Sequence, residues 1–225
     1  MAVVASSAVL HYVYDPLCGW CYAAAPLVEA AHAIANLAIE LHGGGLMSGA
    51  NRRRIDARWR DYVMPHDRRI AEITGQPFGD AYFDGLLRDT STVLDSTPPI
   101  AAIVTATTLA GRGHDLLRRI QRAHFVEGRR VADTAVLQSL AEDIGLDAND
   151  FADTFRQVSG DDVDRHIVES RALLAEVGGR GFPTFALRRG AGWQVLDVGP
   201  HLGQPSRWTA YLIEQIGISA QHATR

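Results

Sequence analysis

The chain contains no lysine, and all 22 of its basic residues are arginines. This absence excludes Schiff-base chemistry on a lysine side chain and a Walker-type phosphate loop, which requires a Gly-Lys pair. A large excess of charge of either sign is also missing, because the net charge is −4 over 225 residues. The overall charge therefore gives no indication of binding to nucleic acid or to an anionic membrane.

Long hydrophobic runs are missing as well, and none approaches the roughly 18 apolar residues that a membrane-spanning helix requires. Residues 1–8 include no basic residue, and a predicted strand follows them almost at once. A secretory signal has a charged segment and a longer apolar core. Either the protein is cytoplasmic or a leader has been removed, and we favour the cytoplasm. We expect neither a membrane nor a nucleic acid among its partners.

Cysteine occurs only twice, as Cys18 and Cys21. In a reducing compartment a lone Cys-x-x-Cys pair indicates a redox-active or metal-binding site rather than a structural disulfide. Residues 9–14 have the composition of a strand, and residues 22–37 have apolar side chains at helical spacing. Cys18 is thus predicted at a helix N-terminus, where unpaired N–H groups and the helix dipole favour a thiolate. The pair predicts dithiol–disulfide chemistry, in which the second sulfur releases the mixed disulfide formed by the first.

The order of the predicted elements indicates a single sheet built from both ends of the chain. Residues 1–45 are predicted as strand, helix and strand, with the helix running from residue 19 to about residue 36. Residues 46–179 are predicted as helices without a convincing strand, and residues 180–217 as a β-hairpin followed by a helix. We therefore predict an α/β fold with a βαβ…ββα sheet and a long all-helical insertion. In domain terms, 1–45 and 180–217 form a discontinuous domain and 46–179 an inserted helical domain.

Three segments carry a resemblance to a known family: Asp15-Pro16-Leu17-Cys18-Gly19-Trp20-Cys21-Tyr22, then Pro26, and finally Gly181-Phe182-Pro183-Thr184-Phe185. Together with the order of elements, they resemble the DsbA-like thiol-disulfide oxidoreductases, particularly the cytoplasmic FrnE-type branch. That family has a thioredoxin-like fold with a helical insertion. The resemblance covers both ends of the chain, while the helical middle matches only in architecture.

The resemblance implies a role for each residue of the site. Cys18 is the attacking sulfur and Cys21 the more buried, resolving sulfur, while Pro183 is expected in the cis form and facing the cysteine pair. The supporting residues of the active site are then Asp15, Gly19, Trp20, Phe182 and Thr184. The implied enzyme is a thiol-disulfide oxidoreductase acting on protein or peptide thiols and disulfides, without cofactor or metal. Glutathione or a thioredoxin-type reductant is the candidate electron partner.

The sequence departs from the family pattern at one position. Many relatives have a buried carboxylate six residues before the first cysteine, as a proton acceptor for the second, and here that position is Tyr12. The nearest carboxylate is Asp15, three residues before Cys18. Asp15 either takes over the role of proton acceptor or caps the start of the helix, and the sequence leaves both possibilities open.

Other kinds of site find less support. A zinc site would need further ligands beside the cysteine pair, and His11, His42 and His201 are scattered along the chain. The segment His42-Gly43-Gly44-Gly45 matches an esterase oxyanion segment, but the Gly-x-Ser-x-Gly elbow that an esterase requires does not occur. We expect this glycine run to be a strand exit near the site.

Two alternative functions remain open on the same fold. Relatives similar to kappa-type glutathione transferases and hydroxychromene-carboxylate isomerases bind glutathione, usually with serine in place of the first cysteine. A cysteine at position 18 argues against such an enzyme. The chain could also be a non-catalytic binding module, in which the helical insertion holds a partner and the sheet is only a scaffold.

Overall fold

The structure, a computed structural model, describes residues 8–190 and 192–222. A four-stranded sheet in the order β2-β1-β5-β6 joins the two ends of the chain. Strand β1 is parallel to β2 and antiparallel to β5, which is antiparallel to β6. The strands are β1 (Ala8–Tyr14), β2 (Leu37–Gly43), β5 (Thr184–Arg189) and β6 (Gly192–Leu196). The predicted α/β fold with a βαβ…ββα sheet and a helical insertion is confirmed.

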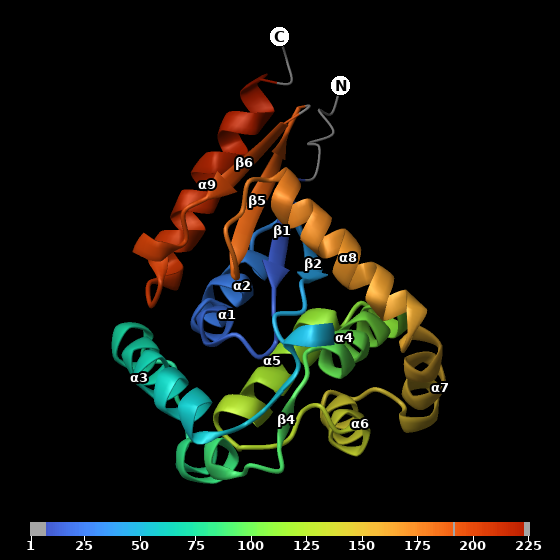
Figure 1. The fold of residues 1–225 in the computed structure, drawn as a ribbon. Helices are drawn as coiled ribbons and strands as arrows, with labels where there is room; N and C mark the ends of the chain where they lie inside the picture. Colours follow the sequence, from blue (N-terminus) through green and yellow to red (C-terminus); the bar gives the residue numbers. More distant parts are fainter. Residues whose placement is uncertain (1–7, 191, 223–225) are drawn as a thin grey trace.

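The core face of the sheet comes from alternate residues of β1. Leu10, Tyr12 and Tyr14 are fully buried and point to one side, as the period of two in a strand requires. The ring of Tyr12 stacks on Phe185 of β5 with 4.5 Å between the ring centroids. Phe185 in turn meets Trp208 of α9 (Pro205–His222) edge to face, at 5.4 Å. Helix α9 therefore covers this side of the sheet, and Figure 1 shows α8 (Asp161–Glu176) flanking the other side.

The first helix is interrupted, in contrast to the single helix predicted from residue 19 to about residue 36. The structure has α1 (Gly19–Ala23) and α2 (Ala25–His32), with Ala24 between them. Pro26 lies in the first turn of α2, where its missing N–H and its ring are tolerated; inside a longer helix they would break the hydrogen-bond ladder. The proline noted in the sequence therefore divides the helix soon after the second cysteine.

The inserted segment contains mostly helices, but the expectation that it lacks strands is wrong. Strand β3 (Arg53–Arg54) pairs antiparallel with β4 (Val93–Leu94). Strands of two residues are too short to produce an alternating pattern. The helices are α3 (Ala57–Thr74), α4 (Thr97–Ala110), α5 (Gly113–Phe125), α6 (Thr134–Asp143), α7 (Ala148–Val158) and α8. Short 3-10 or π turns occupy Gly49–Asn51, Ala81–Gly85, Leu86–Arg88 and Gly199–His201.

The sheet and the insertion share one apolar cluster. Leu10 and Phe185 of the sheet belong to it together with Ile100 of α4, Leu116 of α5 and Phe151 of α7. Strand β1 points toward these helices, so the segment after its C-terminal end lies where sheet and insertion meet (Figure 1). The division into domains stays a prediction. Within the part of the chain that the structure describes, no helix has the length and apolar character needed to cross a membrane.

Candidate active site

Both cysteines are free thiols at the start of α1. Cys18 is the N-cap residue with extended backbone, and its carbonyl accepts hydrogen bonds from the N–H groups of Cys21 and Tyr22, both at 3.0 Å. Cys18 is 9% exposed, whereas Cys21 is completely buried. Burial raises the pKa of the Cys21 thiol well above its usual range, and its hydrogen bond with the Cys18 thiol adds to the effect. Of the two cysteines, only Cys18 keeps any exposed surface, so it is the better placed of the pair to meet an incoming disulfide.

The loop before β5 lies directly over Cys18. The peptide bond between Phe182 and Pro183 is cis, and the Cys18 thiol donates to the carbonyl of Phe182 at 3.7 Å. Thr184 begins β5, is paired in register with Val13, and donates its hydroxyl to the carbonyl of Gly181 at 2.7 Å. Strand pairing between β1 and β5 thus brings together two segments that are 164 residues apart in the chain.

The glycine run at the end of β2 is packed closely against this loop. A Cβ atom on Gly44 would lie 2.2 and 2.3 Å from Cε1 and Cζ of the Phe182 ring. On Gly43 it would lie 2.8 Å from Ile100, and Gly45 has a φ of +67°, which favours glycine. The strand exit therefore lies near the site, as expected, and glycine lets the Phe182 ring approach the backbone.

Asp15 is fully buried, and its carboxylate accepts hydrogen bonds from the backbone N–H groups of Leu17 and Leu46, at 2.8 and 2.5 Å. It is the backbone N–H of Asp15 that contacts Cys21, donating to Sγ at 3.4 Å. Burial raises the pKa of the carboxyl to about 6, although these hydrogen bonds oppose the shift. The carboxylate thus connects the start of the Cys-x-x-Cys segment to the loop after β2.

Tyr12 occupies the position where relatives carry a carboxylate. Its hydroxyl donates to the carbonyl of Cys21 at 3.4 Å, and burial together with the Cys21 sulfur raises the pKa of the phenol well above its usual range. Arg171, which the sequence did not single out, donates from α8 to the carbonyls of Gly44 and Gly45, at 2.8 and 2.6 Å. No local pattern marks it, because its partners are more than 120 residues away.

The residues between the two cysteines face different neighbours. Trp20 is half-buried against the main apolar cluster. Gly19 lies against α3 of the insertion, where an added Cβ atom would be 2.4 Å from Oδ1 of Asp67. Asp67 is buried, its Oδ2 accepts from the Tyr82 hydroxyl at 2.7 Å, and burial raises its pKa to about 6. The sequence did not single out Asp67, because there it resembles the other charged residues on the exposed face of a helix.

The raised pKa of Asp67 predicts a measurable pH dependence of stability. A carboxyl with a higher pKa in the folded state stabilises the fold while it is protonated, and this stabilisation is lost as the pH rises from about 4 through about 6. Asp67→Asn keeps a neutral group at all pH values. We expect the free energy of unfolding of the variant, minus that of the wild type, to be about 1–3 kcal/mol larger at pH 7 than at pH 4, so that the variant gains stability relative to the wild type as the pH rises. Urea unfolding at the two pH values measures this double difference.

The matched control is Asp61→Asn, because Asp61 is an exposed carboxylate on the same helix. This substitution should change the free energy of unfolding by similar amounts at both pH values. An Asp67→Asn variant with the same small pH dependence as the control would show that the Asp67 carboxyl is solvated rather than buried beside Gly19.

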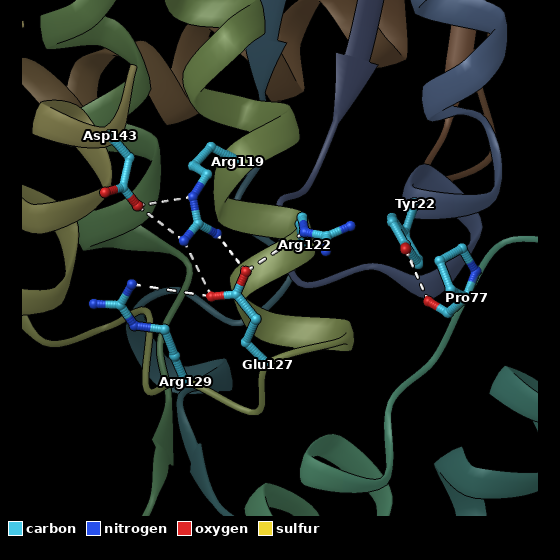
Figure 2. A network of polar contacts seen from close by, with 7 residues as sticks. All are labelled: Tyr22, Pro77, Arg119, Arg122, Glu127, Arg129 and Asp143. Carbon is cyan, nitrogen blue, oxygen red and sulfur yellow. Dashed lines mark hydrogen bonds and ion pairs between the residues drawn. The ribbon is translucent and has the colours of Figure 1, made fainter. Parts of the chain in front are cut away.

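A polar network behind α1 holds the scaffold of the site in place (Figure 2). The Tyr22 hydroxyl donates to the carbonyl of Pro77 at 2.8 Å, which ties α1 to the segment after α3. Arg119 of α5 makes ion pairs with Glu127 and Asp143, both at 2.9 Å. A cavity of about 430 Å³ is lined by Tyr22 of α1 and by Arg118, Arg119 and Arg122 of α5. Because Glu127 and Asp143 offset the charge of Arg119, we interpret this network as part of the scaffold.

A groove of about 500 Å³ runs along the loop that faces Cys18. It is lined by residues 178–184 and by residues 195–198 at the end of β6. The first of these segments contains three glycines, and residues 181–183 around the cis peptide bond are only partly buried. An extended peptide could therefore reach backbone groups beside the cis peptide bond.

Two of the histidines described as scattered are in contact, so that expectation is wrong for them. His11 Nδ1 and His42 Nε2 are 3.0 Å apart on neighbouring strands, with Glu40 beside them. Within the residues that the structure describes, His11, Glu40 and His42 form a group whose possible ligand atoms all lie within 4.8 Å of one another. These atoms are close enough together to hold a metal ion. Their separation along the chain hides this contact, which arises from the pairing of β1 with β2.

Comparisons with known proteins agree with this geometry. The family model of the DSBA-like thioredoxin domain matches residues 9–198. The structure of the cytosolic disulfide reductase DsbM from Pseudomonas aeruginosa is 52% identical, with a TM-score of 0.88, over 93% of this chain and 99% of that chain. The same protein with GSH is similar at a TM-score of 0.86 and 52% identity, over 92% and 98%.

A 2-hydroxychromene-2-carboxylate isomerase shares the fold at 14% identity and a TM-score of 0.59, over 92% of this chain and 97% of that chain. A search of curated protein sequences gave no match. The family model covers most of the chain, including both cysteines and the loop that faces them. The chain therefore belongs to the DsbA-like thioredoxin-domain family.

Proposed function

We propose that this DsbA-like thiol-disulfide oxidoreductase is a cytoplasmic reductase of protein or peptide disulfides, with Cys18 and Cys21 as its redox pair. The observation that carries the proposal is the arrangement of the two free thiols, the first facing the carbonyl of Phe182 and the second buried behind it. The 52% identity to a cytosolic disulfide reductase supports both the direction of the reaction and the compartment.

The reaction is a pair of thiol–disulfide exchanges. The Cys18 thiolate attacks one sulfur of the substrate disulfide, and the other substrate sulfur leaves as a thiolate that takes up a proton. The Cys21 thiol then loses its proton and attacks Sγ of Cys18, which releases the second substrate thiol and leaves a Cys18–Cys21 disulfide. Two molecules of glutathione reduce this disulfide and become glutathione disulfide. The structure of DsbM with GSH supports glutathione as the electron donor.

The supporting residues have distinct proposed roles. Asp15 holds the loop after β2 and the start of α1 together through its hydrogen bonds to Leu17 and Leu46. Gly19 lets α3 approach the cysteine pair, and Trp20, between the two cysteines in the sequence, is only partly buried. Phe182, Pro183 and Thr184 present backbone to an extended substrate in the adjoining groove. A transferase or isomerase function has no observation in its favour beyond the shared fold.

Trapping of the intermediate tests the assignment of the two sulfurs. Cys21→Ser removes the resolving thiol and leaves Cys18 reachable, so incubation with glutathione disulfide should produce a stable mixed disulfide with one glutathionyl group. Intact-protein mass spectrometry measures this adduct, and Cys18→Ser is the matched control that should remain unmodified. Equal labelling of both variants would contradict the proposed order of attack.

A further inference from the structure

Three potential metal ligands meet on the face of the sheet opposite to the buried face of Tyr12. Strands β1 and β2 lie side by side (Figure 1). In their parallel pairing His11 is in register with Glu40, and His42 lies two residues further along the same face of β2. The side chains converge, with 3.0 Å between His11 Nδ1 and His42 Nε2. Glu40 Oε2 is 3.3 Å from His11 Nδ1 and 3.8 Å from His42 Nε2.

We propose that His11, Glu40 and His42 form a binding site for a divalent transition-metal ion of the zinc class. Bonds of about 2.0–2.1 Å in a tetrahedral site place ligand atoms about 3.4 Å from one another. The three separations of 3.0, 3.3 and 3.8 Å lie on either side of that value. An ion could therefore enter with small rotations of the side chains and without movement of the strands.

The donor set selects among metals. Two imidazole nitrogens and one carboxylate oxygen suit Zn²⁺, with water in the fourth position, whereas Ca²⁺ and Mg²⁺ prefer sites made of oxygen atoms. The Glu40 side chain is 56% exposed and those of His11 and His42 are 13% and 20% exposed. The open position thus lies on the side of Glu40, where water and the ion have access.

The surroundings hold the ligands in place. The ring of Trp193 on β6 meets His11 edge to face at 4.7 Å, which restricts rotation of that imidazole. Arg188 is the neighbouring cation, and it is stacked on Trp193 at 4.6 Å and paired with Glu176 at 3.5 Å. Its charge is therefore partly offset by a carboxylate of α8. A bound ion would link β2 to β1, and β1 is the strand that leads to the Cys-x-x-Cys segment.

Zinc titration of a thiol-free protein tests the proposal, because reduced Cys18 and Cys21 would otherwise bind zinc themselves. In the full-length Cys18→Ser/Cys21→Ser variant, competition with a chromophoric zinc chelator should detect one zinc ion per chain. Glu40→Gln, a substitution at an exposed side chain, should weaken zinc binding at least about tenfold, and His42→Ala should abolish it. Bound Co²⁺ should show the intense visible absorption of a tetrahedral site, and the same substitutions should remove it.

His66→Ala is the matched control, since His66 is an exposed histidine on α3 outside the cluster. It should leave zinc affinity unchanged. Zinc should also raise the melting temperature of the thiol-free protein, and the same zinc concentration should raise that of its Glu40→Gln form less. A thiol-free protein that binds no zinc, or that binds it equally well with Glu40→Gln, would show that the cluster is only a His–His hydrogen bond beside a carboxylate. Should His42→Ala fail to fold, Glu40→Gln decides the question alone.

Discussion

Cys18→Ser should lower the rate of protein-disulfide reduction by at least about a thousandfold, because the variant lacks the attacking sulfur. Cys21 cannot replace it, since its side chain is completely buried and its pKa is raised well above the usual range. A serine hydroxyl has nearly the same shape as the thiol, so the fold should persist. Insulin reduction with glutathione as the electron donor measures the rate, and circular dichroism checks the fold.

This result separates three readings of the chain. If the chain is a binding module, the wild type should not reduce disulfides. If it is an enzyme of the glutathione-transferase or isomerase kind, turnover of its substrate should not depend on Cys21. The matched comparison is Cys21→Ser, which should also lose multiple turnover but should still form the mixed disulfide. A Cys18→Ser variant that retained more than about a tenth of the wild-type rate would exclude Cys18 as the nucleophile.

Gly44→Ala should impair both stability and activity. The added methyl group would lie 2.2 Å from Cε1 of Phe182, so the ring must move or the end of β2 must shift. Overpacking of this kind costs about 1–3 kcal/mol in the free energy of unfolding. The Phe182 carbonyl faces the Cys18 thiol, and a displacement there should lower kcat/KM about tenfold to a hundredfold. Urea unfolding and insulin-reduction kinetics measure the two effects.

Gly217→Ala is the control for this substitution, because among the described residues no atom outside the adjoining backbone of α9 lies within 4 Å of a Cβ atom added at that position. It should leave the free energy of unfolding unchanged or slightly raised. Phe182→Leu removes the ring atoms that the methyl group added at position 44 would touch, so the double variant should cost less than the sum of the two single variants. Strict additivity would mean that the Phe182 ring does not limit the space at position 44.

Local sequence signals were sufficient for the order of the elements and for the chemistry. The strand composition before Cys18 and the helical spacing after it predicted where the cysteine pair would lie, and the resemblance carried by the Gly-Phe-Pro-Thr segment implied the loop that faces it. Such signals depend on neighbouring residues, which act through strand alternation, helix periodicity and proline geometry. They were weaker at element ends, so the division of the first helix at Ala24 and the two-residue strands β3 and β4 were not predicted.

The contacts between distant residues were decided only by the tertiary structure. Phe182 meets Cys18 across 164 residues, Asp67 of the insertion lies against Gly19, and Arg171 holds the glycine run after β2. His11 and Glu40 become neighbours only because β1 and β2 pair in one register, and a shift by one residue would separate them. The sequence alone indicated the order of the main strands and helices and proposed Cys18 and Cys21 as the reacting sulfurs. Packing determined which carboxyls are buried beside them, because burial and contact depend on the whole fold rather than on adjacent residues.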